Sequence, residues 1–110
     1  MTKITFYQNH IGQYTGFELK GHTGYMAAGS DIICAAISAL TINTINSLER
    51  LANDNFTVDS DENHAYIRLF ILGNHSKVAD LLLRSLVMGL SDMKADESNQ
   101  EYMDLIFEEV

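Results

Sequence analysis

Two kinds of hydrophobic pattern divide the chain: short runs that alternate apolar and polar residues, and two longer segments with apolar residues at helical spacing. Near the start, two alternating runs flank a polar stretch at 8–13 that contains Gly12. Their apolar residues are Ile4 and Phe6, then Tyr14, Phe17 and Leu19. Alternation on both sides of a polar, glycine-containing stretch predicts a β-hairpin.

Residues 21–29 hold three glycines among small residues and predict an irregular loop. A helix is predicted to follow, because apolar or small side chains then recur every three or four positions. These are Ile33, Ile37, Leu40, Thr44, Leu48 and Leu51. Ser30 or Asp31 can cap the start of this helix, and the polar stretch 53–55 closes it.

A second hairpin is predicted from Phe56 and Val58, a polar turn at 59–64 and an alternating strand at 65–72. The stretch 73–76 then breaks the strand and offers a cap for a second helix, and residues 102–108 alternate as a final strand. The inner face of the second helix is expected to be marked by Val78, Leu82, Leu86 and Leu90, with support from Leu81, Leu83 and Val87.

The predicted order is β-β-α-β-β-α-β, which indicates one α+β domain over residues 1–110, with two helices packed on a mostly antiparallel sheet. No apolar run approaches the roughly 20 residues that span a bilayer, and the N-terminus lacks the basic segment and apolar core of a signal peptide. The lone cysteine cannot form an internal disulfide, which fits a reducing compartment. We therefore expect a cytoplasmic protein without a membrane partner.

The net charge of −8 is concentrated at the end of the chain, where seven acidic residues follow Leu90 with Lys94 as the one base. An acidic surface repels phosphate backbones and disfavours direct nucleic-acid binding. It would attract a basic protein or peptide, but the charge taken alone favours the simpler interpretation that it keeps the protein soluble.

Cys34 is the first candidate for chemistry. If Asp31 caps the helix, Cys34 is its third residue, where unpaired backbone N–H groups and the positive end of the macrodipole favour a thiolate. The same N–H groups could receive a developing oxyanion. The plainer interpretation is a buried cysteine that packs as a small apolar residue.

His22 stands where the second strand stops and the glycine-containing loop begins, a position that suits a general base or an ordinary surface histidine. Asp31 is either the helix cap or a third catalytic residue that orients the imidazole. Ser38 lies one turn after Cys34 on the same side of the helix, where it can approach the thiol or bond back to a helix carbonyl.

The segment Gly21-His22-Thr23-Gly24, followed by Gly-Ser-Asp-Ile-Ile-Cys-Ala-Ala-Ile-Ser-Ala-Leu at 29–40, closely resembles the signature of the ribosomal-processing cysteine protease family, called Prp. In that family a Gly-His pair precedes a short loop and a helix start of the type Gly-x-Asp-Ile-Val-Cys-Ala. The resemblance extends over essentially the whole chain in length, element order and acidic tail. Thr23 stands where the family usually has alanine, and Ile33 where it often has valine.

The resemblance implies a bacterial cytoplasmic endopeptidase that removes a short N-terminal extension from a basic large-subunit ribosomal protein, the twenty-seventh in the usual nomenclature. It places the family's histidine on His22, its nucleophile on Cys34, and its conserved acid and serine on Asp31 and Ser38. It also implies a homodimer and a mobile cover over the site at 23–30. The supporting or substrate-binding residues are then Gly21, Gly24, Tyr25, Gly29 and Ser38.

Three other functions compete with this one. A non-catalytic acidic adaptor that binds a basic ribosomal protein explains the charge but gives Cys34 and His22 no role. A thiol redox sensor lacks an internal resolving cysteine. A metal site is disfavoured because His10, His22, His64 and His75 are scattered without ligand spacing. No phosphate-binding glycine loop follows a strand, so neither cofactor nor metal is predicted.

Overall fold

The computed structural model describes residues 1–21 and 28–110, with the backbone alone at 28–31 and 62. The predicted order β-β-α-β-β-α-β is confirmed, with two short 3-10 turns added at Glu62–His64 and Glu97–Asn99. The strands and helices are β1 (Thr2–Gln8), β2 (Tyr14–Lys20), α1 (Ala28–Leu51), β3 (Asn55–Asp61), β4 (Tyr66–Leu72), α2 (Lys77–Ala95) and β5 (Met103–Glu109).

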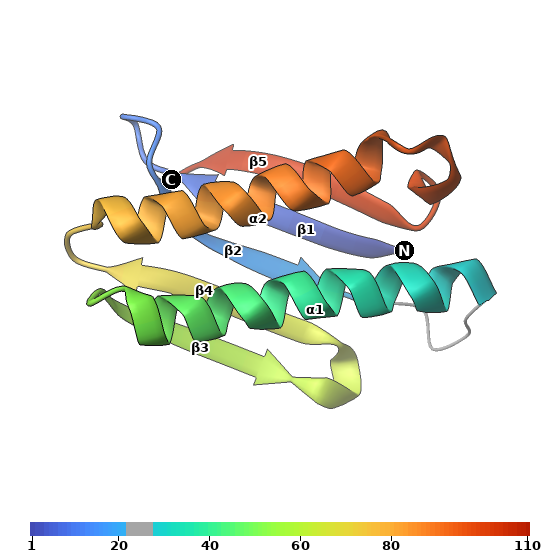
Figure 1. Ribbon diagram of the computed structural model, residues 1–110, viewed down its shortest axis with the longest axis horizontal. Helices are drawn as coiled ribbons and strands as arrows, with labels where there is room; N and C mark the ends of the chain where they lie inside the picture. The colour runs from blue at the N-terminus through green and yellow to red at the C-terminus, as the bar shows by residue number, and fades with distance from the viewer. Residues whose placement is uncertain (22–27) are drawn as a thin grey trace.

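The five strands form one sheet in the order β3-β4-β2-β1-β5. All neighbouring strands are antiparallel except β1 and β5, which pair in parallel, so the predicted mostly antiparallel sheet is confirmed. The two helices pack against each other and run antiparallel on the same face of the sheet (Figure 1). α1 lies nearer the β3–β4 hairpin, and α2 lies nearer β1 and β5 (Figure 1).

The core forms between the helices and the inner face of the sheet. Strand alternation brings Ile4, Phe6, Phe17, Leu19, Leu69, Ile71 and Met103 into it. The predicted inner face of α2 is confirmed at Leu83, Leu86 and Leu90, but Val78 and Leu81 are exposed and the observed buried stripe begins at Ala79. Both stripes have helical spacing, and the small side chain of Ala79 gives little hydrophobic signal where α2 first meets the core.

Two element boundaries differ by several residues from the sequence prediction. α1 begins at Ala28, so Ser30 and Asp31 lie inside the helix and neither residue caps it. β3 continues to Asp61 through the stretch predicted as a polar turn. As an edge strand with one solvent-facing side, β3 needs few apolar residues, so the sequence of its polar end resembles that of a turn.

The stretch Ile32–Leu51 of α1 has a mean hydropathy of 1.4 and is long enough to cross a membrane. The expectation that no apolar stretch reaches this length is therefore wrong for α1. In the fold one face of this stretch packs into the core through Ile33, Ile37 and Leu48, and 28% of the stretch is buried.

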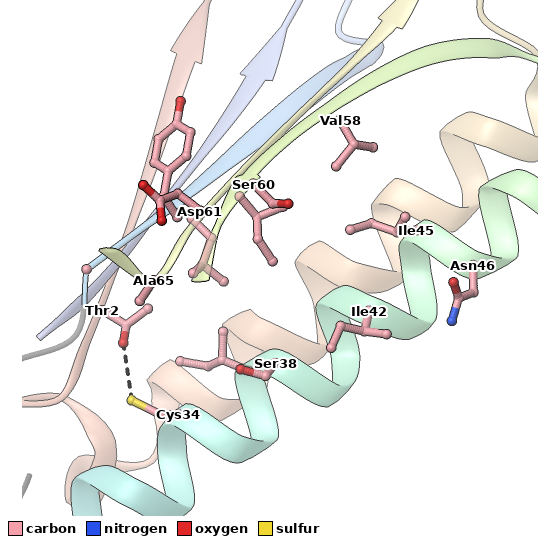
Figure 2. A pocket seen from close by; sticks show the side chains of 15 residues that line it. Thr2, Cys34, Ser38, Ile42, Ile45, Asn46, Val58, Ser60, Asp61 and Ala65 are labelled. Atoms are coloured by element: carbon pink, nitrogen blue, oxygen red, sulfur yellow. Dashed lines mark hydrogen bonds between the residues drawn. The ribbon is translucent and has the colours of Figure 1, made fainter. Parts of the chain in front are cut away.

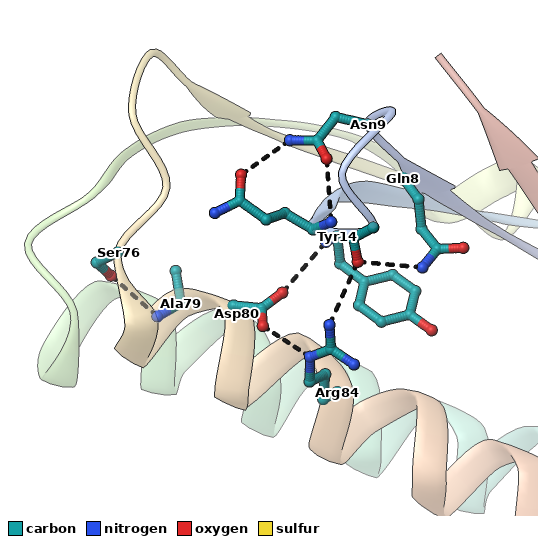
Figure 3. A network of polar contacts seen from close by, with 9 residues as sticks. Gln8, Asn9, Tyr14, Ser76, Ala79, Asp80 and Arg84 are labelled. Atoms are coloured by element: carbon teal, nitrogen blue, oxygen red, sulfur yellow. Dashed lines mark hydrogen bonds and ion pairs between the residues drawn. The ribbon is translucent and has the colours of Figure 1, made fainter.

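The turn between β1 and β2 is fastened to the first turns of α2 (Figure 3). The backbone N–H of Tyr14 donates to Asp80 at 3.2 Å, and the guanidinium of Arg84 donates both to Asp80 at 2.6 Å and to the carbonyl of Gly12 at 3.3 Å. These contacts hold the α2 N-terminus against the hairpin and fix the helix layer on the sheet.

The N-terminus of α2 is also bound to the segment that follows α1. Ser76 caps α2, as predicted, by accepting a hydrogen bond from the N–H of Ala79. The backbone N–H of Ser76 donates to the carboxylate of Asp54 at 2.7 Å, and its hydroxyl donates to the same carboxylate. Partial burial opposes ionisation of Asp54, but together these hydrogen bonds outweigh it and hold the pKa of Asp54 below its usual value.

Replacing Ser76 with alanine is expected to lower the free energy of unfolding by about 1–2 kcal/mol at pH 7, because a cap and a carboxylate hydrogen bond are lost. The depressed pKa of Asp54 contributes stability that is present above its usual unfolded value of about 3.9 and is lost as the pH falls below it. The difference between wild type and Ser76→Ala should therefore shrink below about pH 4. Urea denaturation at several pH values measures both effects.

Ser98→Ala is the matched control, because Ser98 donates to Asp96 in the same way but on an exposed turn. We expect it to change stability by less than about 0.5 kcal/mol. An effect as large as that of Ser76→Ala would show that the two serines contribute equally and that the contact with Asp54 adds nothing.

Candidate active site

An open cavity of about 370 Å³ lies between α1 and the β3–β4 hairpin, and Cys34 stands at one end of it (Figure 2). Ser38, Ile42, Ile45 and Asn46 continue from Cys34 along the helix wall, at spacings that keep them on one side of α1. The opposite wall carries Val58, Ser60, Asp61, Ala65, Tyr66 and Ile67, and the floor is formed by Thr2, Leu19, Gly21 and Ile37.

The cavity is polar near Cys34 and apolar farther along α1. Ile42 and Val58 face it from opposite walls although they are 52% and 39% exposed. Apolar side chains that stay exposed on two walls of a groove are typical of a surface that binds a ligand. A thiol at the polar end would meet a group held in that groove.

Cys34 is partly buried and unpaired, and its sulfur lies 3.6 Å from the hydroxyl oxygen of Thr2 on β1. It is the seventh residue of α1, so the prediction that it belongs to the first turn is wrong. Only the first four N–H groups of a helix lack an intrahelical acceptor, and the macrodipole acts mainly within the first turn. The helix start therefore gives Cys34 less support as a thiolate than the sequence suggested.

Gly21 connects β2 to this cavity. Its φ of 71° lies in the left-handed region that favours glycine, and its N–H donates to the carbonyl of Ala65 at 3.0 Å. Ala65, which precedes β4, also has a positive φ, of 48°. This hydrogen bond joins the end of β2 to the start of the paired strand β4. Gly21 and Ala65 both line the cavity.

Asp61, the last residue of β3, is an acidic residue that lines the cavity. The ring of His64 binds its carboxylate at 2.6 Å, and this hydrogen bond is the main reason why the pKa of Asp61 lies below its usual value. Both side chains are exposed to solvent, and His64 has no contact with Cys34 in the described structure. Among the side chains that the structure describes, no three from His, Cys, Asp or Glu form a group that could hold a metal ion.

The structure brings three of the predicted site residues together: Gly21, Cys34 and Ser38 line the same cavity. Asp31 and Gly29 lie in the first turns of α1, where Asp31 precedes Cys34 by about one turn. His22, Gly24 and Tyr25 lie outside the described residues, so their predicted roles stay predictions.

Sequence reasoning missed Thr2 and the whole hairpin wall. Thr2 is 3% exposed on the inner face of β1, and the alternation Thr2-Ile4-Phe6 places it there, but a buried threonine carries no chemical signal by itself. The helix wall could have been found, because Ser38, Ile42 and Ile45 follow Cys34 at spacings of four, four and three. The position of the hairpin wall depends on the pairing of β4 with β2 and β3, which nearby sequence does not specify.

The sequence matches the profile of one protein family, described as "Cysteine protease Prp", over residues 1–104. Among relatives, the "Ribosomal processing cysteine protease Prp" of Staphylococcus aureus is 22% identical over 96 residues, covering 87% of this chain and 91% of that protein. The match therefore spans both the candidate site and the elements that position it.

Two solved structures have the same fold. S. aureus Prp in complex with a substrate peptide has a TM-score of 0.90 at 20% identity, and the match covers 97% of this chain and 99% of that one. S. aureus Prp with a covalently linked product peptide has a TM-score of 0.85 at 23% identity, with the same coverage. At this level of identity the superpositions establish the architecture of the chain.

Proposed function

This chain belongs to the cysteine protease Prp family and is a cysteine peptidase, and from that premise we propose that it processes a ribosomal protein. The proposed substrate is a basic large-subunit ribosomal protein, from which the enzyme removes an N-terminal extension during ribosome maturation. The observation that carries the proposal is a partly buried cysteine at the polar end of an open apolar groove. Such a groove can hold an extended peptide with its scissile bond at the sulfur.

In the proposed reaction Cys34 is the nucleophile and His22 the general base. The imidazole takes the thiol proton, the sulfur bonds to the scissile carbonyl carbon, and the C–N bond breaks as His22 returns the proton to the leaving amine. Water then gives a proton to His22 and adds to the thioester carbonyl, and the S–C bond breaks to release the acid as the proton returns to the sulfur of Cys34. His22 directly follows Gly21, which lines the same cavity as Cys34, and this adjacency supports the pairing.

Asp31 is the proposed third member, which would hold the imidazole in one tautomer and stabilise the imidazolium. Its place in α1, about one turn before Cys34, puts both residues on one side of the helix. Because Asp31 lies within the helix, the competing role of cap no longer applies to it.

The charge of the protein favours a basic substrate. The net charge is −8, and Asp61 is one of the contributing carboxylates and lies in the cavity wall. A field of this sign speeds encounter with a lysine-rich segment and weakens as salt rises. The apolar stretch of the groove, formed by Ile42, Ile45 and Val58, would bind an uncharged part of the extension next to the cut.

The proposal is tested by incubating the purified protein with the ribosomal protein that carries its extension and measuring intact masses. We expect one shortened product, whose mass is lower by that of the extension, and no change in a substrate that already lacks it. Binding without shortening would instead support the acidic adaptor and contradict the protease.

We also propose that the enzyme works in the cytoplasm as a homodimer, as the family resemblance implies. The sheet face opposite the helices supports assembly, because Tyr7, Phe70 and Ile106 remain only partly covered there in a single chain. Light scattering on the active preparation measures the mass in solution, and a monomer mass would contradict the proposed dimer while leaving the protease assignment intact.

A further inference from the structure

We propose that Thr2 is a positioning residue for the reaction: its hydroxyl donates a hydrogen bond to the sulfur of Cys34 and stabilises the thiolate. The inference rests on the proposed function in one respect, which is that Cys34 is the nucleophile. It assigns a role to a residue of β1, a strand that lies outside the sequence motif around Cys34.

The contact joins two elements that are far apart in sequence. The Thr2 hydroxyl oxygen lies 3.6 Å from the Cys34 sulfur, within the range for a hydrogen bond to sulfur (Figure 2). Thr2 is 3% exposed, and its backbone N–H donates to the carbonyl of Tyr102 at 2.9 Å. The strand pairing of Thr2 with Met103 holds its backbone in place, and a β-branched side chain has few χ1 alternatives.

The chemistry of the pair fixes the direction of the hydrogen bond during reaction. With a neutral thiol, either atom can donate. A thiolate has no proton, so the Thr2 hydroxyl must donate to it, and a hydrogen bond to a charged acceptor is stronger than one between neutral groups. A donor that binds the charged form shifts the equilibrium towards that form.

The Thr2 hydroxyl therefore supplies the thiolate stabilisation that the sequence analysis predicted from the N–H groups at the helix start. Cys34 lies in the second turn of α1, beyond the free N–H groups. Besides Cys34, the titratable residues among the described lining of the cavity are Asp61 and Tyr66, and neither is a cation. The carboxylate of Asp61 binds His64, and the hydroxyl of Tyr66 donates to Glu18. The ammonium of Lys94 on α2 donates to the carbonyls of Gln100 and Met103. Lys3 and Asp104, the next residues on β1 and β5, alternate to the opposite face of the sheet.

The test is the pH profile of Cys34 alkylation by iodoacetamide in three variants of the full chain. Thr2→Val keeps the shape of the side chain and removes the hydroxyl, Thr2→Ser keeps the hydroxyl, and Thr15→Val removes another buried hydroxyl. Thr15 donates to the carbonyl of Tyr7 at 3.2 Å and does not line the cavity, so its variant is the matched control.

In Thr2→Val we expect the pH midpoint of alkylation to rise by about one unit, which lowers the thiolate fraction about tenfold at pH values well below the midpoint. The alkylation rate there should fall about threefold, because the remaining thiolate is about threefold more nucleophilic. Above both midpoints the variant should react about threefold faster, because a more basic thiolate is the better nucleophile. The two pH profiles should therefore cross. Thr2→Ser should restore the wild-type midpoint, and Thr15→Val should keep it.

An unchanged or lowered midpoint in Thr2→Val would overturn the proposal, since the hydroxyl would then not favour the thiolate. If Thr2→Val does not fold, Thr2→Ala serves as the second variant without a hydroxyl, with the same expected rise. Alkylation reports on Thr2 without any substrate. A failure of the proposed function would appear separately, as cleavage that survives the loss of Cys34.

Discussion

Replacing Cys34 with alanine should abolish cleavage of the extended ribosomal protein, lowering kcat/KM by at least about 10⁴-fold. The reason is that the sulfur forms the bond to the scissile carbonyl carbon, and alanine leaves no atom that can do so. Cys34→Ser should be nearly as inactive, because a hydroxyl is far less ionised than a thiol at neutral pH. Intact-mass measurement over a time course gives the rate, and the same spectra show any thioester that accumulates on the wild type.

The matched control is Ser85→Ala, which removes a similarly small side chain from an exposed position on α2 outside the cavity. It should cleave at the wild-type rate. Cys34 is only partly buried, so Cys34→Ala should keep its circular dichroism spectrum and unfold near the wild-type midpoint. A folded Cys34→Ala that still shortened the substrate would remove Cys34 from the chemistry and leave the groove as a binding surface.

The periodicity of the sequence was sufficient for the order of the elements, but local signals failed at the start of α1. Ser30 and Asp31 are good N-caps and Gly29 is a poor helix residue, so these local preferences predict a helix that begins after them. Each of these preferences contributes only about 1 kcal/mol. The burial of Ile33, Ile37 and Leu48 in the core stabilises the helix by more than that, so preferences of this size at its end do not fix its first residue.

Some residues of the candidate site can be predicted from the sequence, and others cannot. Cys34 and Ser38 are four residues apart on one helix, so their proximity follows from helix geometry alone. Thr2 and the hairpin wall reach the cavity through pairing between β1 and β5 and between β2 and β4, which a single sequence does not specify. The candidate nucleophile can therefore be identified from the sequence, whereas the groove and the Thr2 contact can be identified only from the three-dimensional structure.

Gly16 shows how closely the strands behind the groove are fitted, and Gly16→Ala is expected to lower the free energy of unfolding by about 3 kcal/mol or more. A Cβ atom at this position in β2 would lie 2.1 Å from the carbonyl oxygen of Leu69 and 2.8 Å from the ring of Phe70. Because the closer atom belongs to the backbone of the paired strand, no side-chain rotation relieves the overlap. Urea denaturation monitored by circular dichroism measures the loss.

Gly89→Ala is the informative comparison, because its Cβ would lie 3.4 Å from a methyl group of Leu40, an ordinary contact, and alanine favours a helix over glycine. That variant should be as stable as the wild type or more stable by up to about 1 kcal/mol. A loss below about 1 kcal/mol in Gly16→Ala would mean that β2 and β4 separate easily. Since β4 carries Tyr66 and Ile67 into the cavity, easy separation would also mean that the groove wall is not held at a fixed distance from Cys34.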